Sequence, residues 1–169
     1  AYKKAQYWNE FNNILSLPEA GLYFGITAFN SKLYKSGIQV LNESSKSEFT
    51  NFIDNRTTDN GTILYYAVDK TIEDIEKAKL PEEIKSVAII TFTDGLDLGS
   101  LRQENMEDIY DSKSDYLDAV HNRIKSTQIK GNKIVSYSIG LRGNDVGSSE
   151  DQIAEFRQNI EKIASKPEY

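Results

Sequence analysis

The sequence predicts a three-layer α/β fold in which one doubly wound sheet is flanked by helices. Segments of helical periodicity alternate along the chain with short apolar runs rich in β-branched residues, the pattern of proteins whose helices cover a parallel sheet. The chain has 169 residues, of which 38% are apolar, and this size suits one domain with one core. Because the sequence has no internal repeat and no linker, the predicted domain spans residues 1–169.

The first part of the chain predicts a helix, a hairpin and a second helix. Residues 1–15 carry apolar side chains at helical spacing, and Pro18 follows them. The aromatic and β-branched segment 21–29 predicts a strand. A shorter strand is expected over 37–41 after a polar turn, and a short helix over 47–53.

The rest of the chain predicts helices and strands in alternation. Residues 62–79 have apolar side chains at helical spacing. Residues 86–93 form a nearly continuous apolar run, which is typical of a strand covered on both faces in a parallel sheet. A helix over 114–128 and a strand over 133–139 follow, and a capping-box pattern that begins at Ser149 predicts the start of a last helix.

The composition argues against several classes of function. The net charge of −6 disfavours a nucleic-acid partner, which requires a basic surface. No stretch approaches the ~20 apolar residues of a membrane span, so we expect no membrane insertion by this domain. The chain has no cysteine, and its single histidine, His121, is interpreted as a solvated surface residue, which leaves little for thiolate or imidazole sites.

Polar side chains gather where the predicted strands end and before the helix over 62–79. Ligands of open α/β sheets bind outside the carboxyl ends of the strands, so these loops form a candidate rim. Carboxylate and hydroxyl oxygens favour Mg²⁺, Mn²⁺ or Ca²⁺ over zinc. The rim residues are Thr58, Asp59, Thr62, Asp94, Asp97, Ser100, Asn144 and Asp145.

Each rim residue also has an ordinary structural interpretation. Asp94-Gly95 after a strand is typical of a turn, and a threonine or aspartate before a helix is typical of an N-cap. The sequence contains no glycine-rich phosphate loop and no GxSxG motif, and it predicts no catalytic residues. The residues taken singly predict an α/β domain with a divalent-cation site.

Several segments, taken in order, resemble the von Willebrand factor A domain, also called the integrin I-like domain. GLYFGITAFNSKLY resembles that family's second strand and hairpin, and TTDNGTILYYAVDKTI resembles its G-T loop and helix. SVAIITFTDGLDLGS resembles its T-D-G strand and loop. KGNKIVSYSIGLRG resembles a later strand, and IEKIASKPEY resembles the helix that ends in an A-S-x-P motif.

The resemblance implies a Rossmann-like sheet of von Willebrand A type with a metal-ion-dependent adhesion site. That family takes its cation ligands from a D-x-S-x-S loop, a threonine and the aspartate of T-D-G. The matching positions here are Thr62 and Asp94, and Asp59 and Asp97 are rim candidates beside them. A protein ligand would offer an acidic group to the bound Mg²⁺, or to Mn²⁺ or Ca²⁺ in its place.

The chain departs from the family pattern because it contains no D-x-S-x-S motif. In the family this motif follows the first strand, which precedes the helix that residues 1–15 resemble. We therefore expect the sequence to lack the first strand, and also the strand that follows the family's last matched helix.

The resemblance implies a cation-dependent protein-binding or adhesion module and no enzyme. Asn, Lys and Ile are abundant, as in AT-rich bacterial genomes, so we expect a bacterial protein that is extracellular, on the cell surface or periplasmic. The alternative is a metal-independent assembly or scaffold domain of an intracellular machine linked to an ATPase or chelatase. A third interpretation is a metal-assisted phosphohydrolase that uses Asp94 and Asp97.

Overall fold

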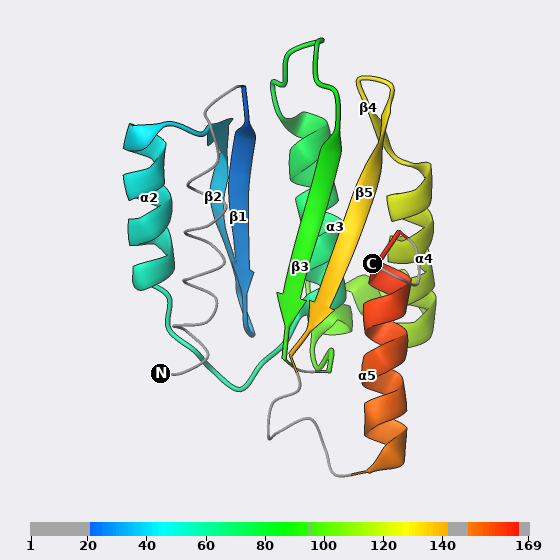
Figure 1. The fold of residues 1–169 in the computed structure, drawn as a ribbon. Helices are drawn as coiled ribbons and strands as arrows, with labels where there is room; N and C mark the ends of the chain where they lie inside the picture. Colours follow the sequence, from blue (N-terminus) through cyan, green and yellow to red (C-terminus); the bar gives the residue numbers. More distant parts are fainter. Residues whose placement is uncertain (1–20, 95, 142–148, 166–169) are drawn as a thin grey trace. The chain divides into compact units, whose positions relative to one another are not determined.

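The computed structural model describes residues 21–94, 96–141 and 149–165, so the helix expected over 1–15 lies outside the described residues. Within these ranges the chain is mixed α/β, with five strands, four α-helices and two 3₁₀ turns (Figure 1). It divides into two units, which are described separately. One contains residues 1–26 and 35–57, and the other contains residues 27–34 and 58–169.

The described part of the first unit contains one helix and most of a hairpin, whose tip, residues 27–34, belongs to the second unit. β1 (Tyr23–Phe29) and β2 (Leu33–Val40) form a two-stranded sheet, and α2 (Glu43–Asp54) follows. Phe49 of α2 is fully buried with Leu41, and the Phe24 and Phe49 rings meet edge to face at 5.0 Å. This apolar contact fastens the helix to the hairpin.

Three strands form the sheet of the second unit. β3 (Val87–Thr93) runs parallel to β5 (Asn132–Gly140), with Val87 opposite Ile134 and Thr93 opposite Gly140. The strands predicted over 86–93 and 133–139 are confirmed to within one residue at each end. Their parallel arrangement is confirmed as well. β4 (Gln128–Ile129) pairs antiparallel with β5, although the sequence predicts that the preceding helix extends to residue 128.

Three α-helices belong to the same unit: α3 (Leu64–Lys77), α4 (Lys113–Ser126) and α5 (Glu150–Ile163). Two 3₁₀ turns, η1 (Ser100–Arg102) and η2 (Met106–Asp108), precede α4. α4 and α5 pack on β5, and α3 packs on α4. None of the described helices is both long and apolar enough to cross a bilayer.

The two faces of the β3–β5 pair differ in burial. Alternate residues on one face are buried, among them Ile89 and Ile134, whereas Ile90 is 48% and Ile139 is 41% exposed on the other. The apolar run over 86–93 predicts a strand covered on both faces, and within the second unit the described helices α4 and α5 pack on β5. The coverage could not be read from the run, because both faces carry apolar side chains.

The strands form two sheets, β1–β2 and β3–β5–β4, where the sequence predicts one. The described structure therefore has the predicted α/β class. Its second unit holds a parallel β3–α4–β5 arrangement, in which the crossover between the parallel strands contains a helix. The carboxyl ends of β3 and β5 consequently lie at the same edge.

Candidate functional site

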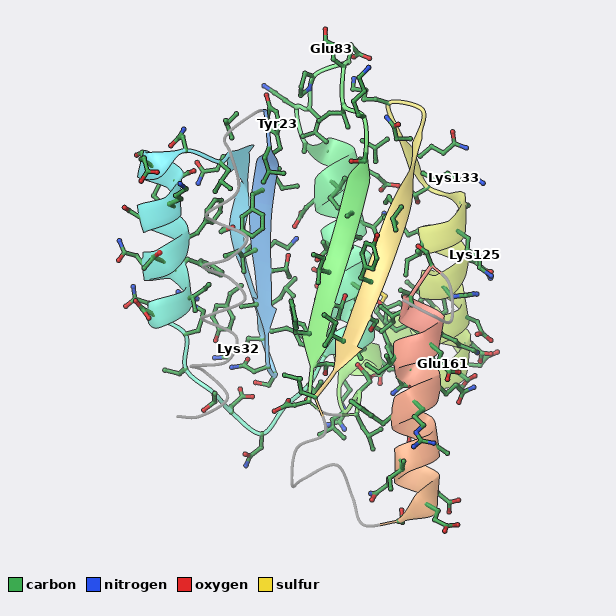
Figure 2. The ribbon with its side chains drawn as sticks, in the orientation of Figure 1. Tyr23, Lys32, Glu83, Lys125, Lys133 and Glu161 are labelled. Atoms are coloured by element: carbon green, nitrogen blue, oxygen red, sulfur yellow. The ribbon has the colours of Figure 1, made fainter. Side chains whose placement is uncertain are left out.

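The predicted site loops begin at the carboxyl edge of the β3–β5 sheet. Leu141 follows β5, and its N–H donates to the main-chain oxygen of Thr93, the last residue of β3, at 2.8 Å. Figure 2 labels Glu83 and Lys133 at the opposite edge, where β3 and β5 begin. Asp94 comes directly after Thr93 and is exposed, so the structure places this predicted ligand at the carboxyl edge.

Thr62 lies in the segment that leads into α3, and this segment is hydrogen-bonded to the loop after β3. The N–H groups of Leu98 and Gly99 donate to the main-chain oxygen of Thr62, at 2.8 and 3.1 Å. The structure thus brings together the two segments that carry Thr62 and Asp94, although they are about 30 residues apart in the sequence.

Asp97, predicted as a rim residue, is fully buried. Its carboxylate accepts hydrogen bonds from the Tyr65 N–H at 3.3 Å, the Ser100 N–H at 3.2 Å and the Ser100 hydroxyl. Burial raises the pKa of Asp97, and the hydrogen bonds from Ser100 and Tyr65 oppose this effect. In the described structure this carboxylate points inward and binds donors of its own loop and of the start of α3.

Asp59 connects the tip of the hairpin to the loop before α3. Its carboxylate accepts hydrogen bonds from the Ser31 N–H at 3.0 Å, the Gly61 N–H at 2.8 Å and the Ser31 hydroxyl. The bond from the Ser31 side chain is the main cause of a lowered pKa for Asp59. Neighbouring Thr58 is exposed, and the remaining rim residues, Asn144 and Asp145, lie outside the described residues.

Lys113 is a basic residue at this edge that the sequence analysis did not single out. Its ammonium group donates to the main-chain oxygen of Asp97 at 3.2 Å and pairs with Glu155 of α5 at 2.8 Å. Lys113 is the first residue of α4 and follows the N-cap residue Ser112. The sequence around it is that of an ordinary helix start. Only the fold brings it to Asp97, so no sequence signal could have found it.

The single histidine is not the solvated surface residue that the sequence predicts. His121 is half-buried on α4, and its Nδ1 lies 2.6 Å from the main-chain oxygen of Lys162, in the last turn of α5. The carbonyl groups of a last helical turn lack partners within their own helix. His121 therefore joins α4 to the end of α5.

The chemistry of the edge suits a hard cation in part. Thr62 supplies a hydroxyl and Asp94 a carboxylate, the oxygen donors that Mg²⁺ prefers. Across residues 21–94, 96–141 and 149–165, however, no three His, Cys, Asp or Glu side chains are grouped so as to hold a metal ion. Further ligands would be waters, hydroxyl or main-chain oxygens, or groups from outside these ranges.

A comparison with protein-family models found no match, and a comparison with curated protein sequences found none. The likeness to the von Willebrand A family therefore rests on the motifs in the sequence. The fold adds an α/β unit in which two of these motifs, the G-T segment and the T-D-G segment, are hydrogen-bonded to each other.

Proposed function

We propose that the chain is a divalent-cation-dependent protein-binding module of von Willebrand A type. The observation that carries the proposal is the pair of hydrogen bonds from Leu98 and Gly99 to the Thr62 oxygen, which joins the two segments that carry the candidate ligands. In this proposal the strands belong to one three-layer, Rossmann-like sheet, and Thr62 and Asp94 are cation ligands at its carboxyl edge. The protein acts extracellularly, on the cell surface or in the periplasm.

The proposed mechanism follows from the coordination chemistry of Mg²⁺. This ion requires near-octahedral oxygen ligands and keeps several waters, so a site with few protein ligands retains exchangeable positions. Held by Thr62 and Asp94, such an ion would offer an exchangeable position to an acidic side chain of a protein partner. The chain itself supplies one hydroxyl and one carboxylate, and we expect a weak affinity for the ion alone, with a Kd of about 10⁻³ M.

A titration with Mn²⁺ tests the cation site directly. Mn²⁺ broadens the NMR signals of nearby residues, so the isotope-labelled chain is titrated with Mn²⁺ and then with excess Mg²⁺. We expect broadening centred on the amides of Thr62 and Asp94, and its reversal by Mg²⁺. Thr62→Val and Asp94→Asn should each reduce the broadening about fivefold or more, since the first removes a hydroxyl ligand and the second replaces a charged carboxylate with a neutral amide.

The matched control is Glu83→Gln, which removes one exposed carboxylate at the opposite edge of the sheet. This variant should bind Mn²⁺ like the unmodified chain. Broadening that is absent, or that survives Asp94→Asn unchanged, would contradict the cation-dependent function. Such a result would favour the metal-independent scaffold domain of an intracellular ATPase- or chelatase-linked machine.

A further inference from the structure

The start of α3 has no cap of its own. Its N-cap residue is Ile63, whose side chain makes no capping hydrogen bond, and its first turn has no acidic residue. A capping side chain ordinarily accepts a hydrogen bond from the second or third N–H of a helix. In α3 these two N–H groups belong to Tyr65 and Tyr66.

The loop after β3 supplies the missing acceptors. Asp97 accepts from the Tyr65 N–H at 3.3 Å, and the Ser100 hydroxyl oxygen accepts from the Tyr66 N–H at 3.0 Å. Ser100 in turn donates its hydroxyl hydrogen to Asp97. The buried side chains of Asp97 and Ser100 thus take the place of an N-cap side chain. Asp97 is 32 residues from Tyr65, whose N–H donates to it.

Hydrogen bonds also run in the opposite direction. Leu98 and Gly99, which lie between Asp97 and Ser100, donate their N–H groups to the Thr62 oxygen. The loop therefore accepts from the helix start through its side chains and donates to the preceding segment through its main chain. Neither segment can shift along the other without breaking several of these bonds.

A buried carboxylate is costly unless donors surround it. Asp97 is 0% exposed and receives two N–H groups and one hydroxyl, so its position is determined by fixed groups on both segments. Thr62 lies three residues before Tyr65, and Asp94 lies three residues before Asp97. The hydrogen bonds of Asp97 therefore restrict where both candidate ligands can lie, because each ligand is only three residues from a residue that makes these bonds.

We propose that Asp97 is a positioning residue, which with Ser100 holds the Asp94 loop against the Thr62 segment. Asp97 acts through the position of these two residues and binds no cation itself. The role in cation binding rests on the proposed function, whereas the role in holding the two segments does not. The test has two readouts for this reason.

The first readout is amide hydrogen exchange at Leu98 and Gly99, relative to the amides of β5. Asp97→Ala removes all three acceptor interactions, and we expect both amides to exchange about tenfold faster after correction for β5. Asp97→Asn keeps one oxygen for Tyr65 but turns an NH₂ group toward the Ser100 N–H, so its effect should be intermediate. Ser100→Ala, the mildest of these variants, should raise exchange about threefold.

Ser136→Ala is the matched control for the loss of a buried hydroxyl. Ser136 is fully buried in β5, and its hydroxyl has no partner within the described residues, in contrast to that of Ser100. Glu83→Gln is the control for the loss of a negative charge. Both controls should leave exchange at Leu98 and Gly99 within about twofold of the unmodified chain.

The second readout is the broadening by Mn²⁺ at Thr62 and Asp94, which should weaken about fivefold in Asp97→Ala and Ser100→Ala. Equal acceleration of Leu98, Gly99 and the β5 amides would indicate general destabilisation and overturn the proposal, and so would unchanged exchange. Undiminished Mn²⁺ binding in both variants would also overturn it. If the unmodified chain binds no Mn²⁺ while exchange rises selectively, the cation-dependent function fails and the holding role of Asp97 stands.

Discussion

Gly61 illustrates how one residue determines the path of the loop before α3. A Cβ atom at this position would lie 2.5 Å from the Cβ and 2.7 Å from the Cα of Ser31, at the tip of the hairpin. These separations are well below van der Waals contact, so only glycine allows this approach. The approach places the Gly61 N–H within 2.8 Å of Asp59, which also binds Ser31.

We expect Gly61→Ala to lower the free energy of unfolding by about 1–3 kcal/mol, because the backbone of the tip must move to admit a methyl group. Urea unfolding followed by circular dichroism measures this change. Gly99→Ala is the comparison variant, since a Cβ there would meet only the Ile63 side chain, at 3.3 Å, and no backbone atom. Equal losses in the two variants would contradict the close approach.

The lowered pKa of Glu73 leads us to expect that the stability of the fold depends on pH. Hydrogen bonds from Lys77 and then Lys70 lower the pKa of Glu73 from 4.5 to about 2. The ionised form is thus favoured in the folded state, and its contribution is complete above pH 4.5 and is lost as the pH falls toward 2. Since Lys77 is largely exposed, we expect a contribution of at most about 1 kcal/mol.

Unfolding of the unmodified chain and of Glu73→Gln, measured by urea between pH 7 and pH 2.5, tests this dependence. The difference in the free energy of unfolding should be constant at neutral pH and should shrink below pH 4.5. Addition of 1 M salt at pH 7 should reduce it as well. A difference that stays the same throughout this range would contradict the assignment.

At the residue scale, the sequence could predict where Thr62 and Asp94 lie but not how Asp97 is used. The choice of these two residues as candidate ligands follows from a general rule about strand ends and from the resemblance to a family motif. Asp97 is buried where it accepts from the Tyr65 N–H, beside Ser100, which accepts from the Tyr66 N–H, and both donors come from a distant helix start. No local pattern distinguishes an inward carboxylate from an outward one in such a loop.

At the scale of the elements, α2 shows why a boundary can be missed. The structure begins this helix at Glu43, four residues before the predicted start at residue 47. The sequence prediction followed the apolar residues near Phe49. The start is determined instead by Asn42 and Ser45, whose side chains each accept from the other residue's N–H, at 3.0 and 2.8 Å.

Asn42→Ala removes one half of this capping box, and we expect it to lower the free energy of unfolding by about 1 kcal/mol. Asn42→Ser keeps a capping oxygen and should restore most of the loss. The helical signal of α2 should fray at Glu43 in the alanine variant, which the carbon chemical shifts of residues 43–46 report. If the two variants are equally stable, Asn42 does not cap α2.

At the scale of the whole molecule, the alternation of helices and apolar runs correctly predicts the α/β class and the parallel pairing of β3 with β5. The pairing of strands into sheets could not be predicted in the same way, because hydrogen bonding between strands far apart in the sequence leaves no local trace. Burial of the second face is likewise a property of what packs there. An apolar run shows that a face can be covered but not that it is.

Ile89 and Ile90 test the proposed third layer, since they are neighbours on opposite faces of β3. Ile89 is 6% exposed, and Ile89→Ala should lower the free energy of unfolding by about 2–4 kcal/mol. The proposed three-layer fold requires a similar loss for Ile90→Ala. A loss below about 1 kcal/mol would contradict the third layer.

The hydrogen bonds at the end of the hairpin can form only late in the synthesis of the chain. Thr27 pairs with Thr71, which leaves the ribosome 44 residues later, and at usual rates of translation this takes about 2–9 s. The Ser31 N–H likewise has its acceptor, Asp59, only after a further 28 residues have been made. During this interval the nascent tip lacks these partners, so a pause in translation before Thr71 lengthens the time in which their hydrogen-bonding groups stay unpaired with the rest of the chain.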